Sequence, residues 1–309
     1  MVTGMWIRVR GPVAAVATGA VLVAACSSAS DLATVDGVGI SRGDVLAMRA
    51  PVEGPTAPAA TIRQDLSTLI LEQSLASAAE EQFGVVFTTA DVEARLADPP
   101  DRYVQLFEQL AADPTVGEGL TELNARFTLV RDAVIPELLL EQRGSYQAVI
   151  EESPGLVMRA CVSHIVVATE EDAHDVLTRI TAGEDFATVA AEVSLDQQSP
   201  GGLLQDPQGC LIHHGQMGGE FVEGVIAAPL GEPAGPLSTS SGFHVLMVDE
   251  RSMPTPGEMA ADPMVYLDAA TANDLMGPWF IEAVASADVD VRSTVGVWSA
   301  ESSSVVAAQ

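Results

Sequence analysis

Lysine is missing from this chain. Its 14 basic residues are therefore all arginines, and they face 43 Asp and Glu, which gives a formal net charge of −29. Such an acidic surface repels a phosphate backbone, so nucleic acid is excluded as a partner. The acidic residues are scattered rather than gathered in blocks, a distribution typical of a solvated surface.

Cysteine is also scarce, with only Cys26, Cys161 and Cys210 in 309 residues. Their spacing suggests one special cysteine near the N-terminus and one possible pair. What the chain does have is a hydrophobic content of 48%, which excludes a wholly disordered protein. Its length is large for one compact core and sufficient for two.

The N-terminal region lacks a run long and apolar enough to be a convincing membrane span. Residues 11–25 carry no charge but are few and rich in Ala and Gly. Arg8 and Arg10 precede this run, an order that is typical of a secretory signal peptide.

The end of this segment, Val23-Ala24-Ala25-Cys26, resembles a bacterial lipobox. The resemblance implies that residues 1–25 are removed, that Cys26 is acylated, and that residues 26–32 form a linker. Acyl chains would then hold the protein on the outer face of the bacterial cell membrane. An ordinary signal peptide followed by a chance cysteine is the alternative.

The first body segment begins with an alternating stretch, residues 33–40, that has a turn at Asp36-Gly37 and predicts a tight hairpin. Ser41 with Asp44 three residues later predicts a capped helix start. Apolar residues then recur at helical spacing over 61–83, where Gly84 ends the pattern.

Further helical patterns follow. Thr88 and Asp91 form a second capping pair, and amphipathic stretches cover 103–110 and 120–150. Pro136 predicts a kink or break in the last of these. No nucleophile–base pair, phosphate loop or metal-ligand spacing is visible in this segment.

The stretch Ala33-Thr34-Val35-Asp36-Gly37-Val38-Gly39-Ile40-Ser41 resembles the start of SurA-like chaperones. The resemblance implies that residues 33–155 form a helical domain of the kind that holds unfolded chains. A plain helical bundle is the alternative.

Two apolar runs, 159–167 and 241–248, are each interrupted by a single histidine, His164 and His244. Both runs predict strands, and their placement suggests that the two imidazoles point into one place. Two helical patterns, a Gly-rich turn and a third helix lie between them. The predicted order is strand, helix, helix, strand, helix, strand, strand.

These motifs, taken in order, resemble a parvulin-type (PpiC, rotamase) peptidyl-prolyl isomerase domain of SurA/PrsA-like lipoproteins. The matching residues are His164-Ile165-Val166, Ala182-Gly183-Glu184-Asp185-Phe186, Ser194-x-Asp196, Gly201-Gly202, Gly215-Gln216-Met217, Phe221, Gly235-Pro236 and Thr239-x-x-Gly242-Phe243-His244. The resemblance implies an isomerase domain over 156–251. It implies an α+β fold, in which a small antiparallel or mixed sheet flanked by helices is inserted into the helical domain.

The implied chemistry is rotation about an X–Pro bond, whose barrier is about 18–20 kcal/mol. No bond is made or broken, so no nucleophile, metal or cofactor is required. The resemblance places the proline ring against Met217 and Phe221, with Leu204 as a possible third wall. Gln216 and Phe243 belong to the same motifs and are also assigned to substrate binding.

The resemblance assigns the catalytic group to His164, Asp196, Thr239 and His244. It implies that the histidines share a hydrogen bond that fixes their tautomers. Asp196 would face the substrate amide, and the Thr239 hydroxyl would join the network. Taken singly, each of these residues is more often an ordinary core or turn residue; their order together favours the site.

The sequence also departs from the parvulin pattern. It has Gly201-Gly202-Leu203-Leu204-Gln205 where the family usually has Gly-Gly-Asp-Leu-Gly, and no proline precedes Phe221. A weak or silent site is therefore the alternative, which would make the protein a holdase chaperone. A purely structural surface lipoprotein is a third possibility.

Cys161 and Cys210 flank the predicted site, and outside the cytoplasm a disulfide between them is the natural expectation. The rival interpretation is metal binding, because Cys161-x-x-His164 and Cys210-x-x-His213 have ligand-like spacing. His164 is already part of the parvulin pattern, so we favour the disulfide.

The tail after Arg251 begins with Pro254 and Pro256, which mark a boundary. By the same resemblance, residues 252–300 are expected to pack on the N-terminal helices, and 301–309 to be disordered. The whole chain is thus interpreted as a lipid-anchored isomerase outside the cytoplasm. Its expected partners are unfolded or nascent secreted polypeptides with X–Pro bonds.

Overall fold

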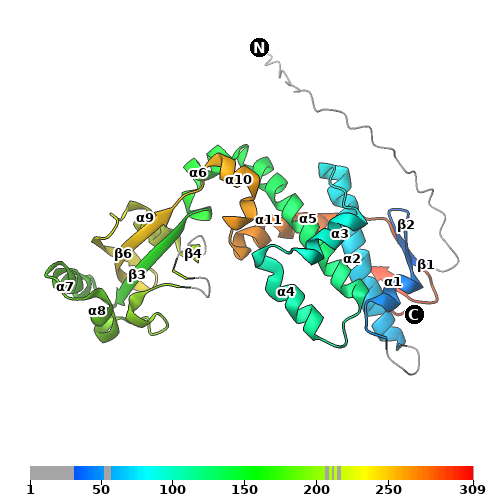
Figure 1. Ribbon diagram of the computed structural model, residues 1–309, viewed down its shortest axis with the longest axis horizontal. Coiled ribbons are helices and arrows are strands. Elements are labelled where there is room, and N and C mark those ends of the chain that lie inside the picture. Colours follow the sequence, from blue (N-terminus) through cyan, green and yellow to red (C-terminus); the bar gives the residue numbers. More distant parts are fainter. Residues whose placement is uncertain (1–30, 52–56, 206–208, 211, 214–216, 309) are drawn as a thin grey trace, which may run out of the picture.

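The computed structural model describes residues 31–51, 57–205, 209–210, 212–213 and 217–308. They form two lobes (Figure 1). The sheet lobe comprises the described residues of 159–252, and the helical lobe is built from the segments before and after it. The chain passes between the lobes twice, beside the contacting helices α6 (Tyr146–Glu152) and α10 (Pro256–Ala261).

The helical lobe starts with the predicted hairpin, formed by β1 (Asp31–Val35) and β2 (Val38–Ser41). Asp36 and Gly37 have φ values of 50° and 82°, as a tight turn between twisted strands requires. On its other edge β1 pairs with β7 (Val289–Val291), so the sheet order is β2-β1-β7. The first described strand is thereby joined in one sheet to a strand from the C-terminal part of the chain.

The main helices of this lobe are α1 (Arg42–Ala47), α2 (Ala59–Phe83), α3 (Thr89–Ala97), α4 (Asp101–Ala112), α5 (Glu118–Arg143) and α11 (Ala269–Ser286). The predicted capping boxes at Ser41 and Thr88 are both present, and Gly84 ends α2 in the left-handed conformation. Helix α5 continues through Pro136 and ends at Arg143, where Gly144 is its C-cap. Two short 3-10 turns, Pro154–Leu156 and Pro263–Val265, lie at the connections to the sheet lobe.

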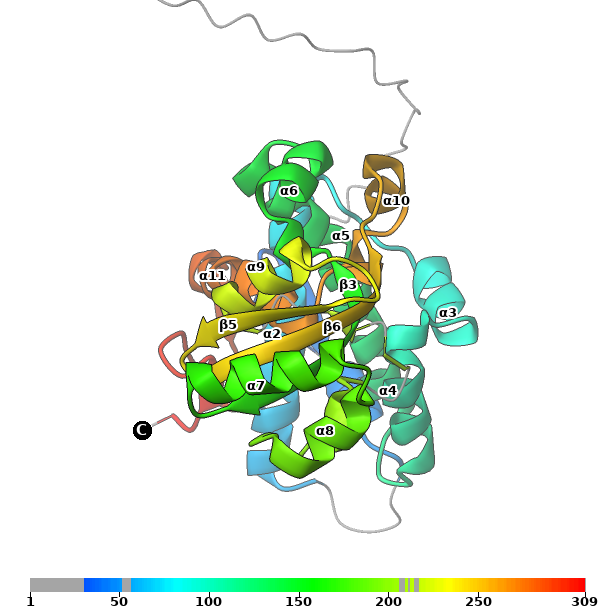
Figure 2. The same ribbon diagram turned by 90° about the vertical axis from the view of Figure 1, so that its left-hand side faces the viewer.

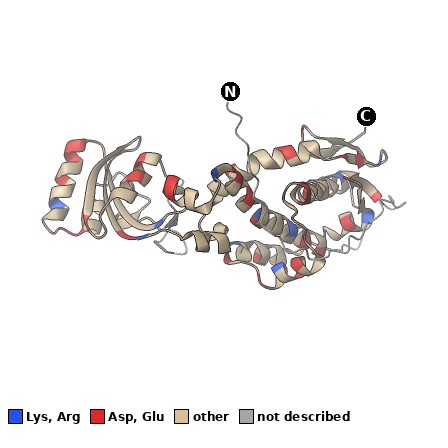
Figure 3. Cartoon of the chain, turned by 90° about the horizontal axis from the view of Figure 1, so that it is seen from above, with Lys and Arg blue, Asp and Glu red and all other residues tan. Residues whose placement is uncertain are grey.

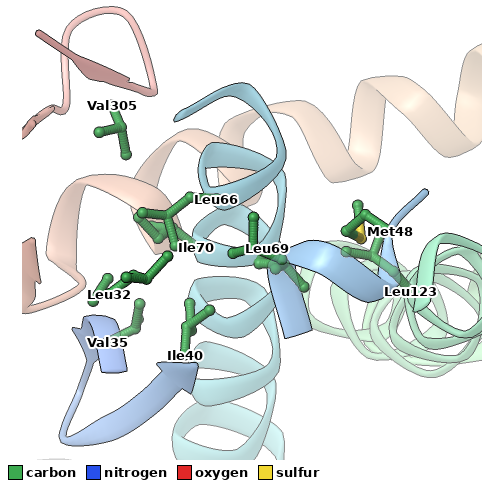
Figure 4. Close-up of a cluster of buried hydrophobic side chains, with 11 residues drawn as sticks. Leu32, Val35, Ile40, Met48, Leu66, Leu69, Ile70, Leu123 and Val305 are labelled. Carbon is green, nitrogen blue, oxygen red and sulfur yellow. The ribbon is translucent and has the colours of Figure 1, made fainter. Parts of the chain in front are cut away.

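The core of the helical lobe is centred on α2 (Figure 4). Leu66, Leu69 and Ile70 pack against apolar side chains of the hairpin, of α5 and of the C-terminal end. A second cluster joins α2 and α5 to α11, where Trp279 Nε1 also donates to Gln82 Oε1 at 2.7 Å. The C-terminal segment is therefore part of this lobe.

The expectation of a disordered tail over 301–309 is wrong for the described residues. Strand β9 (Ser304–Val306) pairs with β8 (Val297–Ser299). Val305 is buried against α2, and its N–H donates to Ser67 Oγ at 2.8 Å. The pairing with β8, the buried Val305 and the bond to Ser67 together anchor this segment.

The sheet lobe has four antiparallel strands in the order β4-β3-β6-β5. They are β3 (Arg159–Val167), β4 (Ile212–His213), β5 (Pro233–Thr239) and β6 (Gly242–Ser252). The two His-containing strands predicted from the sequence, β3 and β6, are the central pair.

Helices cover both faces of this sheet (Figure 2). α7 (Glu170–Thr181) and α8 (Phe186–Val193) pack over Ile165, Val167 and Val245, whereas α9 (Gly219–Ala227) packs over Ala160, Val162, Leu246 and Val248. Because side chains alternate between the two faces along each strand, the sheet contributes to two separate cores. The short turn Pro200–Gly202 follows α8. The predicted α+β fold with an inserted sheet module is confirmed.

None of the helices in the described ranges is both long enough and apolar enough to cross a membrane.

Candidate active site

The two histidines meet on the α9 face of the sheet. In the β3–β6 register Val166 is paired with His244, so His164 lies two residues along the neighbouring strand on the same face. The rings stack at 28° with their centroids 5.5 Å apart. Both residues are buried, at 8% and 5% exposure.

The expected hydrogen bond between the histidines is absent from the described structure. Each Nε2 atom instead bonds away from the pair: His164 Nε2 lies 2.8 Å from Asp196 Oδ2, and His244 Nε2 lies 2.8 Å from Thr239 Oγ1. Each Nδ1 is buried and has no partner among the described residues. Because the rings stack face to face, neither directs an N–H at the other.

Asp196 fixes the tautomer of His164. Burial raises the pKa of Asp196, but hydrogen bonds from Ser199, the Gln198 N–H and His164, with the charge of His164, bring this pKa to about 2. The ionised carboxylate can only accept hydrogen bonds, so His164 must carry its proton on Nε2. A neutral His164 therefore has an unprotonated Nδ1.

His244 remains uncharged at neutral pH. Burial lowers the pKa of His244, and the nearby His164 lowers it further; although Asp196 opposes this, the pKa is about 4. The Thr239 hydroxyl that contacts Nε2 also accepts the Ser241 N–H at 3.1 Å. The turn between β5 and β6 therefore holds the hydroxyl that orients this imidazole.

An apolar wall stands against the histidine pair. The Phe221 ring, near the start of α9, lies edge-on to both imidazoles at centroid distances of 5.7 and 5.4 Å. Leu204 is buried in the same cluster, and Met217 is partly buried against it. The three predicted wall residues thus belong to one apolar cluster, in which Phe221 contacts the two histidines.

The Gly-rich turn is what brings Leu204 to this place. Gly202 has φ of 81°, and a Cβ there would stand 2.5 Å from the carbonyl oxygen of His164. Only glycine fits so near the strand. Leu204 N then donates to Val162 O at 2.9 Å, which holds the turn along β3.

Of the predicted site residues that the structure describes, Phe243 does not join this group. Phe243 is contradicted as a substrate contact, because it points to the opposite face and packs with the α7–α8 core. Neighbouring residues in a strand face opposite ways, so Phe243 cannot share a face with His244. Gln216 and the lipidation candidate Cys26 lie outside the described residues.

Cys161 and Cys210 form the expected disulfide, with their Cα atoms 4.8 Å apart. The bond joins β3 to the segment between Leu204 and Met217. Sulfurs paired in this way are not thiolate ligands, which counts against the metal interpretation. The disulfide therefore ties Cys210 to the strand that carries His164.

Two supporting residues, Ser194 and Arg251, were given no role from the sequence. Ser194 is buried, and its Oγ accepts from Val166 N at 3.2 Å and from Asp196 N at 3.3 Å. Arg251 Nη1 donates to the carbonyls of Val225, Ile226 and Ala228 at the end of α9. The motif Ser194-x-Asp196 was a signal for Ser194, whereas the sequence contained no signal for the role of Arg251.

The fold and the site together define a small four-stranded sheet module in which an apolar cluster stands against two buried histidines. Residues 164–250 match the family model described as Rotamase, PPIC-type PPIASE domain. The chain thus carries a parvulin-type peptidyl-prolyl isomerase domain and is SurA/PrsA-like.

Similar proteins include the foldase protein PrsA of Halalkalibacterium halodurans, 27% identical over 168 residues that make up 49% of this chain and 50% of that protein. The parvulin-like PPIase of Rickettsia bellii is 30% identical over 42% of this chain and 45% of its own. A crystal structure of PrsA from Bacillus anthracis, 19% identical, covers 71% of this chain and 96% of its own at a TM-score of 0.41. The matches span about half the length of the two curated relatives.

Proposed function

We propose that this protein is a peptidyl-prolyl cis-trans isomerase that assists the folding of polypeptides containing X–Pro bonds. The observation that carries the proposal is the ring cluster: Phe221 edge-on to His164 and His244, with Met217 and Leu204 beside it. The proline ring lies against this wall, and the bond to be rotated lies over the imidazoles.

The barrier to rotation arises from amide resonance, which is lost in the twisted transition state. The planar amide is the more polar form, so water favours it over the twisted one. An apolar wall next to an uncharged His244 solvates the polar, planar amide less well than water does. The site accelerates rotation to the extent that it favours the twisted form over the planar one.

Within the site, Asp196 and Thr239 act mainly by holding the imidazoles. The carboxylate of Asp196 already accepts from His164 and from the Gln198 N–H at 2.8 Å each. We propose that Asp196 presents its charge to the substrate amide from this fixed position. No cofactor or metal takes part in the proposed reaction.

We further propose that the protein works outside the cytoplasm, anchored by acylated Cys26, on secreted polypeptides. The Cys161–Cys210 disulfide supports an oxidising compartment, and the lipobox-like sequence supports the anchor. The expected result is that the wild-type chain fractionates with membranes and Cys26→Ser does not. Equal distribution of both proteins would contradict the anchor.

The isomerase proposal is tested by refolding a protein whose slow phase is limited by an X–Pro bond. Catalytic amounts of the chain are expected to shorten this phase, and Phe221→Ala, which removes the central ring, is expected to abolish the effect. An aggregation assay on the same client separates isomerase from holdase. Suppressed aggregation with an unchanged slow phase would favour the holdase alternative.

A further inference from the structure

The sheet lobe is poor in cations. Its residues 159–252 contain three arginines against fourteen Asp and Glu, and no lysine. A protein that binds an acidic side chain next to a proline needs a guanidinium or ammonium group close to the site. The positions of the three arginines therefore bear on which charge a substrate can carry beside its X–Pro bond.

All three arginines lie away from the histidine pair. Arg179 is on α7, on the other face of the sheet, and its Nη2 lies 2.7 Å from the carboxylates of two neighbouring glutamates. Arg251 directs its Nη1 at the carbonyls that end α9. Arg159 begins β3, five residues or about 16 Å along the strand from His164, and lines a cavity on the side of the helical lobe. Within the described sheet lobe, no guanidinium is thus placed to bind an anion at the ring cluster.

A carboxylate stands instead at the edge of the apolar wall. Glu220 precedes Phe221 in the first turn of α9 and is exposed. A Cβ on Gly218 would lie 3.5 Å from Glu220 Oε2, so this carboxylate lies over the residue that follows Met217. It also offsets the positive end of the α9 dipole, which by itself favours an anion.

Asp196 supplies a second negative charge within the cluster. Burial opposes the ionised form of Asp196, but its hydrogen bonds outweigh this effect and bring its pKa to about 2. Its Oδ2 lies 2.8 Å from His164 Nε2, and the Phe221 ring lies edge-on to the same imidazole. One carboxylate therefore lies beside the imidazole that Phe221 contacts, and the other lies next to Phe221 in sequence.

We propose that this site selects its substrates by charge, and turns over X–Pro bonds flanked by Lys or Arg in preference to those flanked by Asp or Glu. The inference rests on the proposed isomerase function and names the substrate class for it. A cation beside the proline is attracted by Asp196 and Glu220, whereas an anion is repelled by both. Because both carboxylates are reached by solvent, the preference weakens as salt screens them.

Four peptides of the form acetyl-Ala-X-Pro-Phe-amide test the proposal, with Lys, norleucine, Gln or Glu at X. Norleucine and Gln are the uncharged matches of Lys and Glu. NMR exchange with the full chain gives kcat/KM for each peptide at about 0.01 M and about 1 M salt, where the Debye length is about 30 and 3 Å. We expect the Lys peptide to exceed the Glu peptide at least tenfold at low salt and about twofold or less at high salt. Equal values for the two at low salt, or a ratio that salt does not change, overturn the proposal.

Variants locate the charge that selects. Glu220→Gln should lower the ratio of the Lys to the norleucine peptide at least twofold at low salt. Glu171→Gln is the matched control, because it removes the same charge from the first turn of α7, on the other face of the sheet (Figure 2). A merely structural disturbance lowers both peptides together and leaves their ratio unchanged. An equal response to both variants, or none to Glu220→Gln, overturns the role of Glu220.

The same peptides separate this inference from the isomerase proposal. If all four exchange equally fast with the chain and faster than without it, the isomerase function stands and only the charge selection is wrong. If none exchanges faster with the chain than without it, the isomerase proposal fails, and the charge selection fails with it.

Discussion

At the scale of single residues, the two histidines of the site are held in different ways. A carboxylate fixes the Nε2 of His164, whereas a hydroxyl contacts the Nε2 of His244. His244 is the one whose pKa is displaced to about 4, chiefly by burial. The site is therefore built around an imidazole that stays neutral over the physiological range.

This displacement predicts how stability depends on pH. In the unfolded chain His244 has its ordinary pKa of 6.5, and in the folded chain about 4. Its contribution to stability is fully present above pH 6.5 and is lost as pH falls through 4, because the unfolded state binds the proton first. Urea unfolding at pH 7, 5.5 and 4.5 measures this loss. His244→Asn should flatten the pH dependence in that window, and an unchanged slope would contradict the assignment.

The Thr239 hydroxyl supplies a second prediction. Thr239→Val keeps the shape of the side chain but leaves His244 Nε2 without its partner, at a cost of about 1–3 kcal/mol. We expect kcat/KM on a proline peptide to fall about tenfold. Thr239→Ser should restore most of it, since it returns the hydroxyl. Full activity in the valine variant would show that the hydroxyl does not orient the ring.

Residue identities were easier to predict than the contacts between them. The motif order identified His164, Asp196, Thr239 and His244, which the structure places together. The motif alone did not say which face Phe243 occupies, although strand alternation next to His244 could have shown it. The orientation of the rings depends on the register between β3 and β6, so the stacked pair without a mutual hydrogen bond was not predictable.

At the scale of elements, the segment that begins after Gly202 is where the sequence departs from the parvulin pattern Gly-Gly-Asp-Leu-Gly. The disulfide from Cys161 to Cys210 fastens it to β3, and Leu204 is fastened by its backbone bond to Val162. The departure from the family pattern therefore coincides with a covalent tether. The sequence predicted the pairing of the two cysteines, but not that Leu204 is held to the same strand by its backbone bond to Val162.

The tether should contribute strongly to stability. It joins residues 49 apart, for which the chain-entropy model gives about 4 kcal/mol. The variant Cys161→Ala/Cys210→Ala should lose roughly 2–4 kcal/mol in urea unfolding and should have reduced isomerase activity. Dithiothreitol should lower the free energy of unfolding of the wild type and leave that of the double variant unchanged. A loss below about 1 kcal/mol would show that other contacts suffice to hold the segment.

Strand β9 is an element that was not predicted from the sequence. Its only buried side chain is Val305, within a stretch of serine and alanine. Deleting residues 304–309 should cost about 2–3 kcal/mol, because it exposes the surface that Val305 covers and removes the bond to Ser67. Deleting only 307–309 is the control and should have little effect. Equal stability of the two truncated chains would contradict the role of this strand.

At the scale of the whole molecule, acidic residues are spread over both lobes, whereas arginines are concentrated in the helical lobe (Figure 3). Several of those arginines form ion pairs that tie helices together. Arg102, for example, bridges Asp132 of α5 at 2.8 Å and Asp262, which follows α10, at 3.0 Å. Basic residues in this acidic chain thus join segments distant in sequence, a role that the composition alone did not reveal.

The ion pair between Arg102 and Asp262 connects α4 of the helical lobe to the segment by which the chain returns from the sheet lobe. Arg102→Gln should leave isomerase activity on a short peptide near wild type, since Arg102 lies outside the site. It should lower the effect on a large client by about two- to fivefold, because we expect such a client to contact both lobes. The refolding assay and the peptide assay measure the two quantities side by side. Equal changes in both would contradict a role in joining the lobes.

We propose above all that the cluster of His164, His244, Phe221, Met217 and Leu204 catalyses rotation about X–Pro bonds. The most direct test is NMR exchange spectroscopy of an Ala-Phe-Pro peptide with catalytic amounts of the chain. Uncatalysed exchange takes tens to hundreds of seconds. We predict exchange cross-peaks on the second timescale with wild type and with Met253→Ala, whose residue lies outside the cluster, and a loss of at least tenfold with Met217→Ala. Exchange as slow with the wild-type chain as without it would contradict the account.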